Sequence, residues 1–376
     1  MDLQDYRDEI DKIDERMATL FVERMRICAK TAEYKANAGI PIYDAKRIEQ
    51  KMKNADTLTD DEHDQAAVRE LITQMMAIGR RYQYRRQAEL GQSELSNFGF
   101  TPLETLPQRG PVVYQGVEGA YGNAAALQYF GLEVAIYHVE TFEEAMKEVQ
   151  DGRAAYAVLP IENSSAGSVV DNYDLLPRYQ NYIVAETFLP VSHCLLARPE
   201  AELSDIRTVY SHPQALMQCS RFLNAQKEWR QVSLANTAIA ARKVIEEEDK
   251  SQAAVASEIA GQLYGLKTLK SSIQNNQGNT TRFIILSRHA IYRTDASKVS
   301  ITFELPHRSG TLYNILSHFI FNGVSMQMIE SRPIQGRNWE YRFFVDIEGN
   351  LQDIAVKNAL TGIANEAQNM RILGNY

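Results

Sequence analysis

The spacing of apolar residues indicates one long helix at the start of the chain. Residues 2–38 contain neither proline nor glycine, and the period is that of one face of an α-helix. The apolar residues at helical spacing are Ile10, Ile13, Met17, Leu20, Phe21 and Ile27. Such a helix extends roughly 55 Å at about 1.5 Å per residue, longer than a small domain is wide. We therefore expect it to pack against a second copy of itself.

Two further helices complete an all-α module over residues 1–90. A short helix is predicted from Asp44, and a third from about His63 to Glu89. The apolar stripe of the third consists of Leu71, Ile72, Met75, Ile78 and Tyr82. Residues 91–110 collect glycine, serine and proline without periodicity, which predicts a linker.

Beyond the linker the pattern changes to short apolar strands that alternate with helical segments. Residues 111–288 contain two such alternating groups, and the chain returns to the first at the apolar run 281–286. This order predicts two α/β lobes with a cleft. Residues 297–376 follow the order strand, helix, strand, strand, helix, strand, which is typical of an α+β ferredoxin-like module. The fold class is therefore multidomain.

Composition and charge limit the kinds of partner. The 376 residues carry a net charge of −8 with both signs interspersed, so there is no basic footprint for nucleic acid. No apolar run approaches the roughly 18 residues of a membrane span. We therefore expect small-molecule ligands, and neither a nucleic acid nor a membrane as partner.

The three cysteines and the seven histidines give no sign of disulfides or metal. Cys28, Cys194 and Cys219 are odd in number and far apart, and the first residues lack the apolar core of a signal peptide. These features favour the cytoplasm. The histidines show no metal-ligand spacing with each other or with the cysteines, so we expect no metal. The spacing GxxGxxG at Gly116, Gly119 and Gly122 lacks the tight GxG turn of dinucleotide-binding loops.

Cationic side chains follow one face of the long helix. Arg24 and Lys35 are 11 residues apart, which places them within roughly 20° of each other around the helix. Arg24 also lies on the apolar stripe, where an unpaired guanidinium is costly, so an anion is expected beside it. Arg7 points about 100° away and can reach into a partner's site. The alternative is that all three belong to surface ion pairs of a dimer helix.

The order of polar residues in this module resembles the all-α chorismate mutases. The matching residues are Arg7, Arg24, Lys35, Asp44, Arg47 and Gln83. The resemblance implies an intertwined helical dimer that rearranges chorismate to prephenate without a nucleophile. It further implies that Arg24, Arg47 and the partner subunit's Arg7 bind the substrate carboxylates, with Asp44 in the same site. Lys35 and Gln83 would stabilise the charge that builds on the ether oxygen.

Two positions depart from that pattern. Ile48 stands where relatives usually carry a glutamate for the ring hydroxyl of the substrate, and Gly79 replaces a usual serine. The neighbouring Glu49 points about 100° away on a helix and is a poor substitute. We therefore predict a mutase that works with reduced efficiency.

Three motifs in the middle of the chain resemble prephenate dehydratase over residues 111–288. They are PIENSSAGSV at 160–169, YSHPQALMQC at 210–219 and NTTRF at 279–283. The resemblance implies a two-lobed α/β fold of the periplasmic-binding kind that converts prephenate to phenylpyruvate, losing water and carbon dioxide without metal or cofactor. It makes Thr281 the candidate for proton donation or for hydrogen bonding to the leaving hydroxyl. The implied substrate ligands are Glu162, Asn163, Ser164, Ser211 and Gln218.

Some residues around these motifs keep an open or structural interpretation. Arg282 pairs either with a substrate carboxylate or only with the fold. Each polar residue taken singly is also compatible with a turn or a strand-end cap. Ala120 and Gly122 lack the hydroxyls usual in the family's first loop. His193 and His212 are assigned no role.

The tail, residues 297–376, resembles an ACT regulatory domain. The matching signatures for phenylalanine binding are Ser309, Gly310, Thr311 and Leu312, together with Glu330, Ser331, Arg332 and Pro333. Gly310 permits close backbone approach at a helix start, whose N–H groups suit an amino-acid carboxylate. The alternative is ordinary capping at Ser309 and a turn at 331–333.

The chain as a whole thus resembles the bifunctional chorismate mutase/prephenate dehydratases with a C-terminal ACT domain. The resemblance implies phenylalanine biosynthesis with feedback inhibition by phenylalanine, in a homodimer or higher homo-oligomer. One alternative keeps the dehydratase and makes the helical module a dimerisation arm. A second is a non-catalytic amino-acid sensor, which has no need of the Thr281 hydroxyl.

Overall fold

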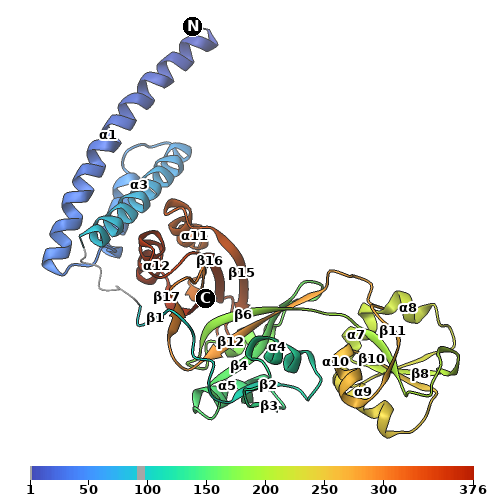
Figure 1. Ribbon diagram of the computed structural model, residues 1–376. Helices are drawn as coiled ribbons and strands as arrows, with labels where there is room; N and C mark the ends of the chain where they lie inside the picture. Colours follow the sequence, from blue (N-terminus) through green and yellow to red (C-terminus); the bar gives the residue numbers. More distant parts are fainter. Residues whose placement is uncertain (1, 91–97) are drawn as a thin grey trace. The chain divides into compact units, whose positions relative to one another are not determined.

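The computed structural model describes residues 2–90 and 98–376, and these form two compact units (Figure 1). Unit 1 comprises Met1–Gly99 and Ser297–Ile372, and unit 2 comprises Phe100–Ala296 and Leu373–Tyr376. The predicted helical module and the predicted tail therefore belong to one unit. Of the predicted linker 91–110, residues 91–97 lie outside the described part of the chain.

The three predicted helices of unit 1 are α1 (Leu3–Ala38), α2 (Ala45–Ala55) and α3 (Glu62–Glu89). Asp2 starts α1 with a capping box, and Gly39, at a φ of 64°, ends it in the left-handed conformation that glycine adopts without strain. Only the second half of α1 packs on α3, through residues such as Arg24 and Ala32. The apolar stripe of its first half is exposed, with Leu20 at 64 %.

The tail of unit 1 has the predicted β–α–β–β–α–β order. Its elements are β14 (Lys298–Leu305), α11 (Thr311–Phe321), β15 (Met326–Pro333), β16 (Tyr341–Glu348), α12 (Ile354–Glu366) and β17 (Gln368–Asn375). The strands lie in the order β15-β16-β14-β17, and the pairs β15·β16 and β14·β16 are antiparallel. The helices α11 and α12 lie against α3.

Unit 2 consists of the two predicted α/β lobes (Figure 1). The sheet of the first lobe has the order β6-β12-β4-β2-β3. Its elements are β2 (Val112–Gln115), α4 (Tyr121–Phe130), β3 (Ile136–Val139), α5 (Phe142–Gln150), β4 (Tyr156–Asn163), β5 (Gly167–Ser168), α6 (Val170–Leu175), β6 (Tyr182–Pro190) and β12 (Thr280–Ser287). Fully buried apolar side chains such as Val158 and Ile285 form its core.

The second lobe is built on a sheet of order β11-β7-β10-β8-β9. Its elements are β7 (Cys194–Ala197), η1 (Leu203–Asp205), β8 (Thr208–Ser211), α7 (Pro213–Gln218), α8 (Ser220–Asn224), β9 (Arg230–Ser233), α9 (Thr237–Glu246), β10 (Gln252–Ala256), α10 (Glu258–Tyr264) and β11 (Lys267–Lys270). The short helices α7 and α8 are separated by Cys219. The chain crosses between the lobes twice, after β6 and before β12, and these crossings position the site described below.

Two pairings involve segments that the sequence pattern did not assign to unit 2. Within the predicted linker, β1 (Thr101–Leu103) pairs in parallel with β13 (Ile291–Arg293). At the end of β17, Gly374 pairs with Ile183 of β6. A Cβ atom at Gly374 would lie 2.0 Å from the carbonyl oxygen of Ile183, so only glycine fits this contact. The strands β1 and β13 have three residues each, too few for periodicity to predict a strand, and the predicted last strand of the tail pairs with β6 only at Gly374.

Three further observations concern the described residues. None of their helices is long and apolar enough to span a membrane. They contain no group of three or more His, Cys, Asp or Glu side chains that could hold a metal ion. Cys28, Cys194 and Cys219 are free thiols.

Candidate active sites

The first candidate site lies where α1 packs on α3. The Arg24 guanidinium reaches across and donates from Nη1 to the carbonyl oxygen of Met75, at 2.8 Å. A Cβ atom at Gly79 would lie 3.1 Å from the same Nη1. Glycine at this position therefore leaves room for the Arg24 side chain against the helix.

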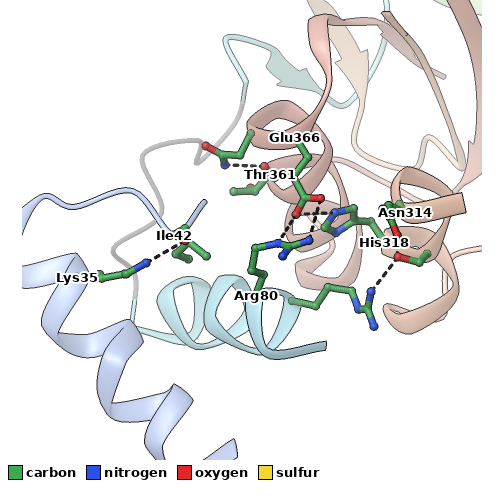
Figure 2. A network of polar contacts seen from close by, with 10 residues as sticks. Lys35, Ile42, Arg80, Asn314, His318, Thr361 and Glu366 are labelled. Atoms are coloured by element: carbon green, nitrogen blue, oxygen red, sulfur yellow. Dashed lines mark hydrogen bonds and ion pairs between the residues drawn. The ribbon is translucent and has the colours of Figure 1, made fainter. Parts of the chain in front are cut away.

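Lys35 and Asp44 meet near the start of α2. The Lys35 ammonium donates to the carbonyl oxygen of Ile42 at 2.9 Å (Figure 2). Partial burial lowers the pKa of Lys35, and the charge of Asp44 opposes that shift. The Asp44 carboxylate also caps α2, because it accepts the backbone N–H of Arg47 at 3.0 Å. Arg47 itself is exposed and donates to Gln50.

Gln83 and Arg7 occupy very different positions around this site. Gln83 is buried on α3, and its Oε1 atom has no hydrogen-bond partner among the described residues. Arg7 is exposed and precedes Arg24 by 17 residues, which on a helix is about 25 Å. One chain therefore brings Arg24, Lys35, Asp44 and Gln83 to the packed half of α1 and leaves Arg7 at its far end.

The other face of α3 makes a buried ionic contact with α11 and α12. Arg80 donates from Nε to Glu366 at 2.9 Å, and His318 Nε2 lies 3.4 Å from the same carboxylate (Figure 2). Burial alone would raise the pKa of Glu366, but His318 and Arg80 outweigh it and lower the pKa. Arg81 donates to Ser317 at 2.8 Å and covers the ring of Phe321, and burial lowers its pKa to about 10. Helix α3 thus carries candidate site residues and also anchors the tail.

The second candidate site begins at the end of β4, where Asn163 lies opposite Thr281 in the antiparallel pair β4·β12. The Asn163 carbonyl oxygen accepts two backbone N–H groups, from Ser165 and Ala166, each at 3.0 Å. Its Nδ2 atom donates to the Thr281 hydroxyl at 2.9 Å and to Asn279 Oδ1 at 2.8 Å. The turn after β4 therefore holds this asparagine in one orientation.

The hydrogen bonds continue from Asn279 across to the second lobe. Asn279 Nδ2 donates to Gln218 Oε1 at 3.3 Å, and His193 Nε2 lies 2.9 Å from that same oxygen. His193 Nδ1 lies 3.1 Å from the hydroxyl of Tyr121. Burial lowers the pKa of His193 and raises the pKa of Tyr121. Asn279 and His193 each stand at one of the two crossings between the lobes.

His193 and Tyr121 have no assigned role in the sequence analysis. Tyr121 lies in the loop 116–122, where the sequence analysis considered only the glycines and the missing hydroxyls, and 72 positions separate it from His193. The one available signal is that a histidine directly precedes a wholly buried strand, β7. A buried polar group needs a partner, and the only way to identify it is from the fold.

Of the two serines predicted for this site, Ser164 lies beside Thr281, whereas Ser211 bonds within the sheet of the second lobe. Ser164 accepts the backbone N–H of Thr280 at 2.9 Å, beside Thr281. Ser211 is fully buried and donates to the carbonyl oxygen of Val255. Its hydroxyl therefore helps hold β8 to β10.

Glu162 and Arg282 lie on the opposite face of the sheet from Asn163 and Thr281, because successive strand residues alternate. Arg282 donates to Glu186 at 2.8 Å and to the Tyr376 hydroxyl at 3.0 Å, and lies 3.6 Å from Glu162. The sequence left open whether Arg282 meets substrate or the fold. In this structure its guanidinium is engaged by protein groups.

The tail of unit 1 contains a cavity of about 310 Å³ at the start of α11. Gly310, Thr311 and Leu312 line it, with Gly310 at a φ of 79°. Four aromatic residues that the sequence analysis did not select also line it, namely Tyr313, Trp339, Tyr341 and Phe343. The predicted Glu330, Ser331, Arg332 and Pro333 lie on β15, paired with β16, and Ser309 is exposed; none of these five is part of the lining.

Comparisons with known proteins match both candidate sites. The family model "Chorismate mutase type II" matches residues 6–84, and "Prephenate dehydratase" matches 112–291. A bifunctional chorismate mutase/prephenate dehydratase from Enterobacter agglomerans is 33 % identical over 380 residues, covering 98 % of this chain and 94 % of the relative. Arogenate dehydratase 5 from Arabidopsis thaliana is 39 % identical over 298 residues, covering 73 % and 70 %.

One similar solved structure is the prephenate dehydratase of Arthrobacter aurescens in complex with L-Phe. It is 31 % identical to this chain, with a TM-score of 0.67. The match covers 71 % of this chain and 89 % of that protein.

Proposed function

The chain belongs to the family of bifunctional chorismate mutase/prephenate dehydratases, and from this premise we propose which of its residues perform the two reactions. The protein converts chorismate to prephenate and prephenate to phenylpyruvate, two steps of phenylalanine biosynthesis. The observation that carries this conclusion is the match to a bifunctional relative over 98 % of the chain. The alternative of a dehydratase with a purely structural arm is disfavoured by the chorismate mutase match over residues 6–84.

For the dehydratase we propose that the Thr281 hydroxyl donates to the departing ring hydroxyl of prephenate. The C–O bond breaks as that oxygen takes a proton and leaves as water. The electrons of the breaking C–carboxylate bond enter the ring, carbon dioxide departs, and the ring becomes aromatic. A free threonine hydroxyl is a weak acid, so its contribution depends on its orientation. The hydrogen bond that Thr281 accepts from Asn163 supports this role, because it leaves the O–H free to donate elsewhere.

We further propose that Asn163, Ser164 and Gln218 contact the substrate of the dehydratase. Their positions around Thr281 support this assignment. Ser211, Glu162 and Arg282 remain predicted ligands; in this structure they bond to protein groups.

For the mutase we propose that Arg24, Arg47 and the partner subunit's Arg7 bind the two substrate carboxylates. Lys35 and the Gln83 amide would stabilise the charge that develops on the ether oxygen as it breaks from the ring. This is catalysis by positioning and preorganised electrostatics, without a covalent intermediate. The inward position of Gln83 and the reach of Arg24 toward α3 support the assignment. The charge of Asp44 acts on the Lys35 ammonium, and Asp44 caps the start of α2.

We propose that α1 forms a homodimer with a second copy of itself. The exposed apolar stripe of its first half supports this, since Ile10, Ile13 and Leu20 are each more than half exposed. The distance of about 25 Å between Arg7 and Arg24 adds to it, because a second copy is needed to bring an Arg7 to the site. The three free thiols are compatible with a cytoplasmic protein.

We propose that the tail is an ACT domain that binds phenylalanine in the cavity at the start of α11. The first backbone N–H groups of α11 suit the carboxylate, and Trp339, Tyr341 and Phe343 suit an aromatic side chain. The L-Phe in the Arthrobacter aurescens complex supports the choice of ligand. Inhibition further requires phenylalanine to prefer a less active arrangement, because a ligand that binds both states equally shifts nothing.

The test of the proposed function follows the purified protein by absorbance with chorismate and, separately, with prephenate, in the presence and absence of phenylalanine. Loss of chorismate and formation of phenylpyruvate, both reduced by phenylalanine, are expected. Turnover of prephenate alone would make the helical module a dimerisation arm. Turnover of neither substrate would favour an amino-acid sensor.

A further inference from the structure

The direction of every hydrogen bond in the dehydratase site follows from one turn. The backbone N–H groups of Ser165 and Ala166 can only donate, so the Asn163 atom that they contact must be its carbonyl oxygen. The other end of this side chain is therefore the NH₂ group. It donates one hydrogen to the Thr281 oxygen and one to Asn279.

The same reasoning passes from Asn279 to the far end of the network. Because Asn279 accepts through Oδ1, its NH₂ group faces Gln218, and the Gln218 atom at that contact must be Oε1. His193 Nε2 lies 2.9 Å from this oxygen and so carries a proton. In a neutral ring Nδ1 then has none and can only accept. The Tyr121 hydroxyl, 3.1 Å away, also lies 3.0 Å from the carbonyl oxygen of Ser192, so its one proton faces two acceptors.

We propose that His193 is a positioning residue of the dehydratase, a neutral Nε2–H imidazole that orients Gln218 so that its NH₂ group faces the substrate. This inference rests on the proposed function. Gln218 Oε1 receives two donors from the protein, from His193 and Asn279, so the rest of its amide can only donate. Thr281, which accepts from Asn163, is likewise left as a donor.

A site that presents donors in this way suits the chemistry of prephenate. The substrate offers carboxylate oxygens, which only accept, and a leaving hydroxyl that needs a proton. If Gln218 turned its amide around, a carbonyl oxygen would face the substrate anion instead, and His193 Nε2–H would face an NH₂ group. Both contacts would be repulsive. The proton on His193 Nε2 therefore fixes the orientation of the Gln218 amide.

The surroundings of His193 keep the ring neutral and in place. Its side chain is buried, and its backbone is held on both sides, by Gln274 Oε1 at 3.0 Å and by the Ile273 N–H at 2.9 Å. The ring of Tyr121 packs edge-on against it at 5.8 Å. Cys194 and Cys219, the thiols nearest to Tyr121, are also neutral, because burial raises the pKa of each, that of Cys219 to about 12. Burial lowers the pKa of His193 and outweighs its hydrogen bond to Gln218, which favours the charged ring.

The test compares two substitutions of similar size. In His193→Gln, the new amide can donate from Nε2 at the position of the lost ring nitrogen, whereas His193→Leu has no donor. We expect His193→Leu to lower kcat/KM for prephenate by about ten- to a hundredfold, mainly in kcat, because a small displacement of oriented groups has effects of this size. His193→Gln should retain most of the activity. Equal losses in the two variants, at equal melting temperatures, would overturn the proposal.

A second measurement needs no folded variant at His193. NMR of the unsubstituted protein with ¹⁵N-labelled histidine distinguishes the two neutral tautomers and the charged ring, and Tyr121→Phe or Gln218→Glu identifies the His193 signals by their shift. The Nε2–H tautomer is expected throughout neutral pH. An Nδ1–H tautomer or a charged ring would contradict the proposal. If the unsubstituted protein did not turn over prephenate at all, the proposed function would fail, which is a different result from either of these.

Discussion

The two candidate active sites use opposite kinds of polar group. The proposed mutase site of unit 1 is dominated by cations, and in one chain Arg24 and Lys35 contact backbone carbonyls while Arg7 and Arg47 are exposed. The dehydratase site of unit 2 consists of neutral amides, a hydroxyl and an imidazole that bond to one another. In the proposed assignment the first site needs Arg7 from a second chain, whereas all residues of the second site come from one chain.

The difference follows from what each reaction needs. The rearrangement of chorismate involves no proton transfer, so the protein has to supply positive charge around the substrate. Exposed cations cost little while the site is empty, and a dimer can assemble them. Dehydration needs a proton directed at one oxygen. Buried neutral groups can point donors in fixed directions without the large cost of burying an unpaired charge.

Unit 1 also contains buried charged side chains, but these hold helices together and lie outside the proposed mutase site. Arg80, Glu366 and His318 meet where α3 packs on α11 and α12 (Figure 2). There each charge has a partner, which is the condition under which buried ions are tolerated. The contrast with the dehydratase site therefore concerns the reactions and is not a general property of the two units.

The substitution with the largest expected effect removes the proton donor. Thr281→Val keeps the shape of the side chain and should lower dehydratase kcat by about a hundred- to a thousandfold, the range seen when an oriented donor to the reacting oxygen is lost. Thr281→Ser, which keeps the hydroxyl, is the matched control. Mutase activity of the same protein should stay unchanged. Dehydratase turnover that survives in a folded Thr281→Val protein would remove Thr281 from the mechanism.

A charge on the exposed stripe of α1 tests whether only the mutase needs a second chain. Leu20→Glu should dissociate the dimer, because an interface cannot bury an unpaired carboxylate cheaply, and mutase activity should fall on the order of tenfold or more at low protein concentration. Dehydratase activity per chain should change much less. Thr19→Glu adds the same charge about 100° away around the helix and serves as control. Sedimentation and both assays over a dilution series provide the measurement.

The substitution Ile48→Glu tests whether the mutase lacks a hydrogen bond to the ring hydroxyl of its substrate. Restoring a glutamate for the ring hydroxyl of the substrate should raise mutase kcat/KM by about fivefold, which corresponds to roughly 1 kcal/mol. Ile48→Gln, with an acceptor but no charge, should give a smaller gain. No improvement with either variant would show that Ile48 is not the cause of a reduced efficiency.

The smallest expected effect concerns pH. Burial lowers the pKa of His193, so the folded protein keeps this ring neutral as pH falls through about 6.5, the ordinary histidine value. Dehydratase kcat/KM should therefore show no His193-dependent loss from about pH 8 to 6.5. The unfolded chain does take up the proton, so His193 lowers the free energy of unfolding progressively below about pH 6.5. His193→Gln should lack that component; melting curves at several pH values measure it.

The local sequence pattern was sufficient to predict most helices and strands. The limits of α1 and α3, the strand and helix order of the tail, and the two lobes of unit 2 follow from periodicity and turn residues. The motif resemblance assigned Asn163 and Thr281 to one site, but their pairing across β4 and β12 is a result of the fold. The sequence pattern did not predict two pairings. One joins the very short strands β1 and β13, and the other is the isolated pairing of Gly374 with Ile183.

Residue types and their spacing alone determined which groups are available to this protein, namely cations on one helix face and amides and hydroxyls at strand ends. These properties depend on neighbours within a few turns or on motif identity. Only the tertiary structure decided how the groups are used. It separated Arg282 from Thr281 by the alternation of one strand, and it joined His193 to Tyr121, 72 positions away. Hydrogen-bond direction and burial arise from residues distant in the chain, so they exist only once the chain has folded.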